Sequence, residues 1–421
     1  MKGISNFQEY SDLTIQYLQG RSKEERSPLG QFITPRSLRK ALVDEIKLKP
    51  GMKVLDPGVG TGEFLATCLE VEPNLYVEGW DIDDKVATVA EKLVPKATIK
   101  VLSALEQEPK EFFDVVIGNP PYFEMRNLEA TVKHKFQDVI GGRPNIFSLF
   151  FAVGIWSLKP GGKLGFVVPP SMNNGAFFSK LRSFILKHSS IEFLKVFDDS
   201  KLFVDAQTAV QLIVLQKGKA SEKYTVDLGK LGKSNNNRTI FVEDKLSFEE
   251  EFNKRSTLWN LGYEAVTGSL VWNQNRQMLR EKKEQHCVPL IWAHNITDAR
   301  EIVLNEAHPK KPQYIYSKDP IKGPAIVVNR ITGSVGHGSL RCAKVPNDFD
   351  FLGENHVNVI RQRPNHPQYV SWDELLDLLR APNINMRIQK LTGNTQISCI
   401  ELTYFLPLDK QIDPILPSTL F

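Results

Sequence analysis

The segment Val54-Leu-Asp-Pro-Gly-Val-Gly-Thr-Gly-Glu-Phe64 places a glycine-rich turn between two apolar stretches. The run Lys53–Asp56 predicts a strand, and Gly62–Val71 predicts a helix. Glycines let a ligand approach the backbone closely, and a helix N-terminus offers unpaired N–H groups. A second predicted strand ends in Gly79-Trp-Asp-Ile-Asp83, where Asp81 can accept hydrogen bonds from both ribose hydroxyls of a nucleoside. Together, the two segments predict a nucleoside-cofactor site.

The glycine spacing favours one class of cofactor. Gly58, Gly60 and Gly62 are spaced G-x-G-x-G, whereas a dinucleotide site has G-x-G-x-x-G. A carboxylate at Asp56 would repel a pyrophosphate, but it suits an ammonium group such as that of S-adenosylmethionine. The alternative is a tight strand–helix turn without a ligand, and the presence of both Asp56 and Asp81 makes it the weaker interpretation.

The first half of the chain alternates short apolar runs with amphipathic stretches, which predicts an α/β fold with a doubly wound sheet and helices on both faces. The predicted strands are Lys53–Asp56, Leu75–Trp80, Ile99–Leu102, Phe113–Gly118, Lys163–Val168, Ile191–Phe197 and Ala209–Leu215. The predicted helices are Ser37–Ile46, Gly62–Val71, Asp84–Leu93, Asn145–Leu158 and Ala176–His188.

Composition changes near Lys217, where Lys, Gly, Ser and Asn become frequent. We therefore expect a catalytic domain over 1–220, a linker over 221–240 and a mixed α+β domain over 241–421. In the last of these, Trp372–Leu379 predicts an amphipathic helix that packs on the core.

Overall composition excludes several classes of protein. The chain has 421 residues, of which 41% are hydrophobic, so it can bury a sizeable core. No apolar run reaches the roughly 20 residues of a membrane span, and the N-terminus is too polar for a signal peptide. Four scattered cysteines without a C-x-x-C pair argue against a zinc site and favour a reducing cytoplasm. A net charge of +4 excludes a histone-like binder of nucleic acid.

A second motif, Asn119-Pro-Pro-Tyr122, follows the predicted strand Phe113–Gly118. Doubly wound sheets carry their sites at the carboxyl ends of strands. The Asn119 side-chain oxygen and the Pro120 carbonyl can accept from an exocyclic amine and stabilise the positive charge that develops during its methylation. Tyr122 offers a flat face for a planar substrate. A strand-terminating turn with a packed Tyr is the alternative, and the nucleoside loop upstream makes it less favoured.

Positive charge is concentrated locally in the second half. From Ala307 to Lys344 there are seven basic residues and a single acid, Asp319. A solvated face and a phosphate-contacting surface explain this window about equally well, since aromatic residues and glycines interleave with the cations.

These motifs resemble those of the gamma-class adenine-N6 DNA methyltransferases, the TaqI-like modification enzymes of restriction–modification systems. Gly30-Gln-Phe-Ile-Thr-Pro35 is similar to their N-terminal cofactor motif, Val54–Phe64 to the loop under the methionine part, and Asn119–Tyr122 to their catalytic tetrapeptide. The resemblance covers residues 28–216 specifically and the region from 240 onward only generally. It implies a mixed sheet of the S-adenosylmethionine-dependent methyltransferase type and a C-terminal domain that reads duplex DNA while the target adenine is flipped out.

The resemblance also implies residue roles. Thr34 would contact the methionine carboxylate, Asp56 its amino group, Asp81 the ribose and Ile82 the adenine ring. Gly58 and Gly60 would let the cofactor approach the backbone. Asn119 and Pro120 would hold the target amine, and Tyr122 would stack on the base. Asn119 would also contact the cofactor. Phe203 is a candidate second aromatic wall, with ordinary core packing as an equal alternative. The DNA contacts would come from the basic window, with Lys310, Lys311, Lys322, Arg330 and Arg341 as candidates.

One position departs from the family pattern. The acid expected after the third strand is missing, and Ser103 and Ala104 stand in its place. Ser103 can supply a weaker contact to the cofactor's adenine, or Glu106 can reach back, so the adenine contact is the least certain part of the resemblance.

The tetrapeptide also occurs in enzymes that methylate a glutamine side chain of proteins or amino groups of rRNA, and a DNA-specificity protein without catalysis is a further alternative. The long C-terminal domain favours DNA. We therefore expect a cytoplasmic, DNA-associated enzyme of a bacterium or archaeon. It would act alone as a monomer on double-stranded DNA, with no metal, and a separate cognate restriction endonuclease could accompany it.

Overall fold

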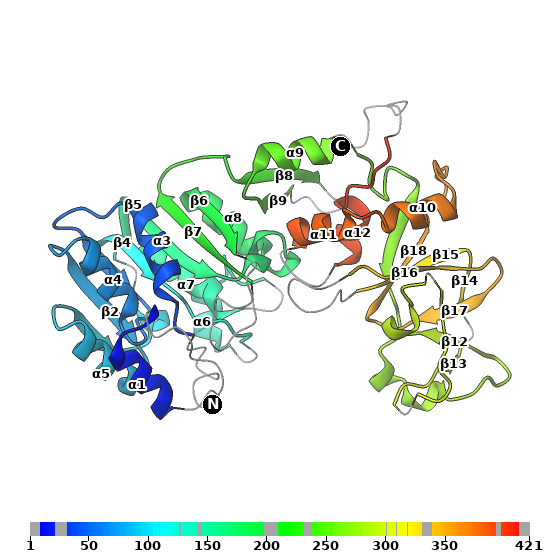
Figure 1. Ribbon diagram of the computed structural model, residues 1–421, viewed down its shortest axis with the longest axis horizontal. Coiled ribbons are helices and arrows are strands. Elements are labelled where there is room, and N and C mark those ends of the chain that lie inside the picture. The colour runs from blue at the N-terminus through cyan, green and yellow to red at the C-terminus, as the bar shows by residue number, and fades with distance from the viewer. Residues whose placement is uncertain are drawn as a thin grey trace. The chain divides into compact units, whose positions relative to one another are not determined.

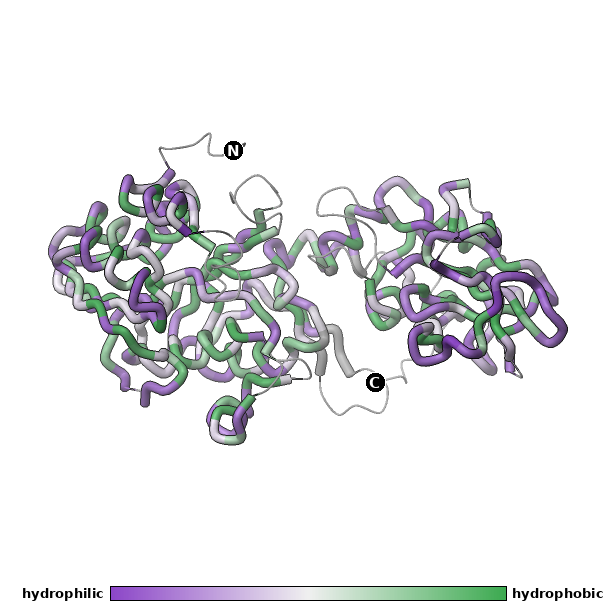
Figure 2. Tube along the Cα trace, turned by 90° about the horizontal axis from the view of Figure 1, so that it is seen from below, coloured by the Kyte–Doolittle hydropathy of each residue, from purple (hydrophilic) through white to green (hydrophobic). Residues whose placement is uncertain are grey.

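The computed structural model describes residues 9–21, 32–108, 110–125, 128–141, 145–197, 209–230, 237–253, 255–299, 301–308, 310–317, 319–330, 339–392 and 397–411. The chain divides into two compact units, Met1–Lys245 and Leu246–Phe421 (Figure 1). Hydrophobic stretches lie inside each unit, and hydrophilic turns lie largely on its outside (Figure 2).

A seven-stranded mixed sheet forms the centre of the first unit, in the order β3-β2-β1-β4-β5-β7-β6. Its strands are β1 (Lys53–Asp56), β2 (Tyr76–Asp81), β3 (Thr98–Val101), β4 (Phe113–Gly118), β5 (Leu158–Val168), β6 (Ser189–Phe197) and β7 (Val210–Lys217). The first five strands pair in parallel, whereas β7 runs antiparallel to both β5 and β6. The strand order reverses between β1 and β4, which is where doubly wound sheets bind their ligands.

Alternate residues of the central strands enter two different hydrophobic cores. Val54 of β1 and Val115 of β4 face one core, and the next residues, Leu55 and Val116, face the other. All four are buried, because a sheet covered by helices on both faces has no solvent side. This confirms the predicted doubly wound α/β fold.

Helices cover both faces of this sheet. The described helices of the first unit are α1 (Asp12–Gly20), α3 (Arg36–Ile46), α4 (Glu63–Val71), α5 (Asp84–Leu93), α6 (Ala130–Lys135), α7 (Ile146–Ser157) and α8 (Ser179–His188). Helix α9 (Lys245–Asn253) begins at the boundary and belongs to the second unit from Leu246 onward. Helix α7 begins after Asn145, whose side chain accepts a hydrogen bond from the Phe147 N–H and caps the helix. The helix expected over Ala176–His188 begins instead as a 3₁₀ turn, Ala176–Phe178, and becomes α-helical at Ser179.

The linker expected over 221–240 is wrong. Strands β8 (Thr225–Lys230) and β9 (Asn237–Phe241) pair there as an antiparallel hairpin. The hairpin belongs to the first unit, because Arg182 of α8 donates to the Thr239 carbonyl at 2.7 Å and Phe241 joins the core of the central sheet. The boundary between the units therefore falls after Lys245, and not near 220.

The second unit is a mixed α+β structure with two small sheets. One sheet has the order β10-β18-β15-β16 and the other β11-β13-β12-β17-β14. Their strands are β10 (Tyr263–Thr267), β11 (Leu279–Arg280), β12 (Cys287–Ile291), β13 (Tyr314–Tyr316), β14 (Ile321–Lys322), β15 (Ala325–Asn329), β16 (Cys342–Val345), β17 (Asp350–Gly353) and β18 (Val357–Gln362). Helices α10 (Trp372–Leu379), α11 (Ile384–Thr392) and α12 (Cys399–Tyr404) follow, and α10 buries Leu375, Leu376 and Leu379, as its pattern predicted.

Candidate active site

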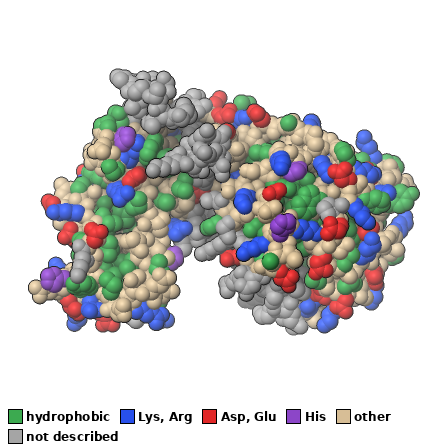
Figure 3. All heavy atoms as spheres, turned by 180° about the vertical axis from the view of Figure 1, so that it is seen from behind, with side chains coloured by type: hydrophobic (Ala, Val, Ile, Leu, Met, Phe, Trp, Pro, Cys, Tyr) green, Lys and Arg blue, Asp and Glu red, His purple; other side chains and the backbone are tan. Residues whose placement is uncertain are grey.

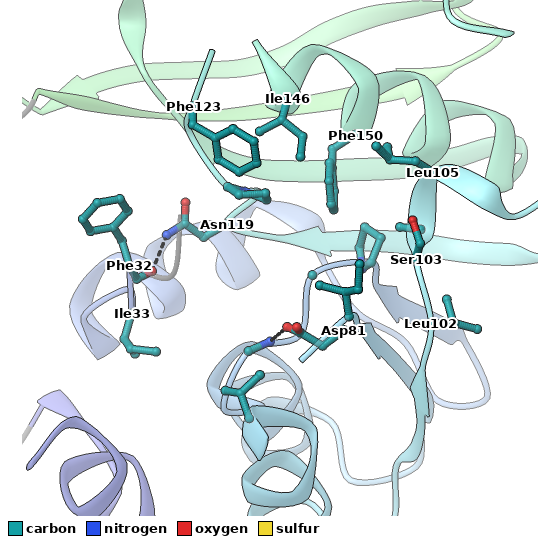
Figure 4. Close-up of a pocket in the computed structure, with 17 residues that line it drawn as sticks. Phe32, Ile33, Asp81, Leu102, Ser103, Leu105, Asn119, Phe123, Ile146 and Phe150 are labelled. Atoms are coloured by element: carbon teal, nitrogen blue, oxygen red, sulfur yellow. Dashed lines mark hydrogen bonds between the residues drawn. The ribbon is translucent and has the colours of Figure 1, made fainter. Parts of the chain in front are cut away.

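A pocket opens along the carboxyl ends of four strands in the first unit. Asn119 follows β4, Gly58 and Gly60 follow β1, Asp81 ends β2, and Ser103 follows β3. Because these strands are neighbours in the sheet, their ends meet in one row. Figure 4 shows Asn119 at one side of the pocket and Ser103 at the other, with Asp81 between them. Among the described residues that line the pocket, three have polar side chains: Asp81, Ser103 and Asn119.

Asp81 ties the glycine loop to the end of β2. One of its carboxylate oxygens accepts from the Gly60 N–H at 2.9 Å, and the other accepts from the Asp83 N–H at 3.0 Å. Gly60 has a φ of +52° and Gly62 one of +87°, so the loop uses the left-handed backbone that glycine tolerates best. Burial raises the pKa of Asp81, with the backbone hydrogen bonds acting in the opposite direction.

Asp56 carries a buried carboxyl group, and the described residues offer few hydrogen bonds to offset the cost of burying its charge. Among the described residues, its carboxyl accepts one hydrogen bond, from the Gly58 N–H at 3.1 Å, and burial raises its pKa to about 8. A Cβ on Gly118 would lie 2.5 Å from its Oδ1, so only glycine fits beside it at the end of β4. Asp56 lies behind the surface that lines the pocket. A buried carboxyl of this kind fits a ligand that brings an ammonium group.

The side chain of Asn119 is held from two directions. Its Nδ2 donates to the Phe32 carbonyl at 2.8 Å, and its Oδ1 accepts from the Tyr122 hydroxyl, which also lies 2.7 Å from the Val167 carbonyl. The Tyr122 ring lies nearly parallel to that of Phe32, with centroids 6.4 Å apart and 17° between planes. Asn119 is therefore fixed in one orientation, with a second lone pair of Oδ1 left for another donor.

The N-terminal helix is fastened to the same loop by polar contacts. The Ser11 N–H and hydroxyl both donate to Glu63, each at 2.8 Å, and Glu63 pairs with the buried Arg39 at 2.8 Å. Thr14 donates to Thr61 at 3.0 Å. Since Thr61 and Glu63 flank Gly62, these contacts hold the turn between β1 and α4 in place.

The other predicted cofactor and catalytic residues are placed as follows. Ile82 lines the pocket and is 66% exposed, an unusual position for an isoleucine and one suited to covering a ligand. Thr34 does not line it, but its buried hydroxyl has no hydrogen-bond partner among the described residues. Pro120 is buried, and Pro121 lines the pocket in its place. Phe203 lies outside the described residues.

Pocket residues that the sequence did not point to come from distant elements. Phe32 lies in the segment before α3, Phe150 lies on α7, and Leu102 and Leu105 flank Ser103. The only available signal was that Phe32 belongs to the Gly30–Pro35 motif. Glu106, the suggested replacement for the missing acid, is exposed and does not line the pocket.

In the second unit, the basic window is only partly free of acids. Lys322 lies 3.3 Å from Asp348, and Lys344 lies 2.7 Å from Asp373. Lys311 lies over the Trp292 ring at 5.3 Å, and Lys310 is exposed. The cations on the face shown in Figure 3 are likewise interspersed with acids.

Arg330 and Arg341 differ from those lysines. Arg330 follows the last residue of β15 and Arg341 precedes the first residue of β16, where the Asn329 N–H donates to the Arg341 carbonyl at 3.1 Å. Neither pairs with an acid among the described residues.

No described helix has the length and apolar character to span a membrane, and the described residues contain no cluster of three or more metal-binding side chains.

Comparison with known proteins places the chain among methylases. The Eco57I restriction-modification methylase family matches residues 74–203. Modification methylase CviBIII of Paramecium bursaria Chlorella virus NC1A is 27% identical, over 52% of this chain and 58% of that protein. Type II methyltransferase M.CvrRI of Paramecium bursaria Chlorella virus XZ-6E is 26% identical, over 83% of this chain and 88% of that protein.

Among solved structures, the type I restriction-modification methyltransferase subunit from Streptococcus thermophilus covers 53% of this chain and 52% of its own, with 17% identity and a TM-score of 0.41. The pocket of the first unit is lined by the Asp81 carboxylate at the end of β2 and by Ser103 and Asn119, and the buried Asp56 carboxyl ends β1 beside the glycine loop. Together with the methylase match over residues 74–203, these features support S-adenosylmethionine as the cofactor and a likeness to the methyltransferases of restriction–modification systems.

Proposed function

We propose that the protein methylates N6 of adenine in double-stranded DNA, with the adenine flipped out of the duplex. The observation that carries this proposal is the position of Asn119 in the same pocket as Gly60 and Asp81, at the reversal of the sheet. An amine acceptor and a nucleoside-cofactor site thus share one cavity. The names of the relatives, which are modification and type II methyltransferases, favour DNA over protein or rRNA as the substrate.

In this proposal, the bound cofactor supplies a methyl group on a sulfonium. Asp81 holds the ribose, Asp56 faces the ammonium, and the hydroxyl of Thr34 gains the partner that it lacks. The free lone pair of Asn119 Oδ1 accepts from the target N–H, and the Pro120 carbonyl accepts from the other. The nitrogen would take the methyl group as the sulfur–carbon bond breaks and the sulfonium becomes a thioether, and one of its protons would then pass to solvent. The acceptors already in position stabilise the positive charge that develops on the nitrogen before that proton leaves. The Tyr122 hydroxyl positions Asn119 while its ring, with that of Phe32, borders the base.

The decisive experiment is expression in a host that lacks adenine methylation, followed by mapping of modified bases in its genome. We expect N6-methyladenine at one short sequence. Label that enters protein or RNA and not DNA would instead support one of the amino-group alternatives. An absence of transfer to any of the three would leave a DNA-specificity role. An extract of the native host, incubated with DNA that carries the same sequence unmodified, tests for a cognate endonuclease. Such an enzyme would cut the DNA at that sequence.

We further propose that the second unit contacts DNA through Arg330 and Arg341. The Arg330→Ala/Arg341→Ala double variant should weaken DNA binding and lower the slope of log affinity against log salt by about 2, because each phosphate contact contributes a slope of about 1. Titration of fluorescent duplex DNA at several salt concentrations measures this. Lys344→Ala is the matched control, since its charge is already 2.7 Å from Asp373. An unchanged slope in the double variant would argue against this surface.

Asp56 gives the cofactor a measurable proton linkage. Burial raises the pKa of Asp56 to about 8, so the carboxyl is mostly protonated in the free protein at pH 7. A neighbouring ammonium stabilises the carboxylate and lowers this pKa. Binding of S-adenosylhomocysteine at pH 7 should therefore release a proton, and affinity should rise as the pH rises toward 8. At still higher pH the ligand's own ammonium loses its proton, and the trend should reverse.

Calorimetry in buffers of different ionisation enthalpy counts the protons released. The Asp56→Asn variant should bind more weakly and lose the buffer dependence at pH 7. Identical heats in all buffers for the unmodified protein would mean that Asp56 does not face the ammonium.

A further inference from the structure

The pocket has two chemically different ends. Asn119 follows β4 and Ser103 follows β3, and β1 and β2 lie between those strands in the sheet. Neighbouring strands are about 4.8 Å apart, so the two residues are separated by about 14 Å along the row of strand ends. Asp81 lies between them, on β2 (Figure 4). If Asp81 holds a ribose and Asn119 the reacting groups, the cofactor's base lies at Ser103.

The Ser103 end is shaped for a flat, apolar ring. Its walls are the side chains of Ile82, Leu102, Ala104, Leu105 and Phe150. Ser103 is the one polar side chain at this end among the described lining residues. Its backbone is held in place, because its carbonyl accepts from the Glu106 N–H at 3.2 Å and the Gln107 side chain at 3.3 Å. Its hydroxyl makes no hydrogen bond with any described residue.

No described carboxylate is available to the edge of the base. Asp81 lies on the neighbouring strand β2, where the proposed function assigns it to the ribose, and Glu106 is exposed and does not line the pocket. This matters because a carboxylate only accepts hydrogen bonds, whereas a hydroxyl both donates and accepts. A carboxylate would select a 6-amino purine and repel a 6-oxo purine. A hydroxyl can accept from the amino group or donate to the oxo group by rotating.

We propose that Ser103 sets a relaxed base selectivity in the cofactor pocket, which therefore takes 6-oxo as well as 6-amino purine nucleosides of the S-adenosylmethionine class. This inference rests on the proposed use of the pocket for that cofactor. The hydroxyl serves as the single polar contact at position 6, and the apolar walls hold either ring by its faces.

The test measures binding without turnover. The dissociation constants of S-adenosylhomocysteine and S-inosylhomocysteine are determined by calorimetry for the unmodified protein and for Ser103→Ala and Ser103→Asp. We expect the unmodified protein to prefer the adenosyl ligand by less than about tenfold. Ser103→Ala should weaken both ligands by about 2- to 10-fold, the effect of one neutral hydrogen bond. Ser103→Asp should widen the preference at least tenfold, since its carboxylate accepts from the amino group alone.

The two ligands also differ at ring position 1, but that difference is common to all three proteins and cancels when their preferences are compared. An adenosyl preference above tenfold in the unmodified protein would overturn the proposal, as would a preference that Ser103→Asp leaves unchanged. If the unmodified protein binds neither ligand, the cofactor assignment itself fails, which is a different outcome. Thermal unfolding of each variant verifies that it is folded.

Discussion

Replacement of Asn119 by alanine should reduce methyl transfer at least about 1000-fold, because it removes the side-chain acceptor that stabilises charge on the target nitrogen. Asn119 Oδ1 is also a partner of the Tyr122 hydroxyl, so the variant removes one of the two acceptors that hold that hydroxyl, the other being the Val167 carbonyl. Binding of S-adenosylhomocysteine should stay within about fivefold, since Asn119 offers at most one hydrogen bond to the cofactor. Single-turnover transfer of labelled methyl to duplex DNA measures the first quantity and calorimetry the second.

Two further variants separate the roles of this pair. Tyr122→Phe keeps the ring but loses the bond to Asn119, so it should lower the rate far less than Asn119→Ala. Asn74→Ala makes the same chemical change on an exposed turn before β2 and should leave the rate unaltered. If Asn119→Ala retained more than a tenth of the activity, the catalytic assignment of the tetrapeptide would be wrong.

The second large effect is expected at Asp81. Asp81→Ala should weaken S-adenosylhomocysteine binding at least about 100-fold, because two charge-assisted hydrogen bonds to a ribose are each worth about 1.5 to 3 kcal/mol. The same carboxylate accepts from the Gly60 and Asp83 N–H groups, so its loss also releases the glycine loop from β2. Calorimetry gives the change in affinity, and the unfolding midpoint shows how much of the change is structural.

Asp81→Asn retains one side-chain oxygen that can accept a hydrogen bond. Its affinity for S-adenosylhomocysteine should therefore lie between those of the unmodified protein and Asp81→Ala. Asp84→Ala is the matched control, because Asp84 is an exposed acid three residues away that does not line the pocket. Equal affinities of Asp81→Ala and the control would remove Asp81 from the cofactor site.

The central strands were predictable from sequence because local residue preferences and burial in the sheet favour the same first and last residues for each strand. β1 and β4 match the predicted Lys53–Asp56 and Phe113–Gly118 to the residue. Each buries its central apolar residues and is followed at once by residues that do not continue a ladder, Pro-Gly after β1 and Asn-Pro-Pro after β4. The hairpin β8–β9 was missed because Lys, Gly, Ser and Asn around it indicate a linker. Its strands are stabilised by contacts with α8 and the core that composition does not report.

The sequence by itself determined the doubly wound fold and the strand-end positions of Asp81, Ser103 and Asn119, because parallel strands bring their carboxyl ends to one edge of the sheet. Only the tertiary structure decided which neighbours complete those positions. Phe32 and Phe150 enter the pocket from elements remote in sequence, the Tyr122 hydroxyl donates to Asn119, and Glu106 is exposed and does not line the pocket. The physical reason is that the positions of strands along the chain are encoded in local periodicity, whereas side-chain partnerships depend on packing between segments that are far apart in sequence.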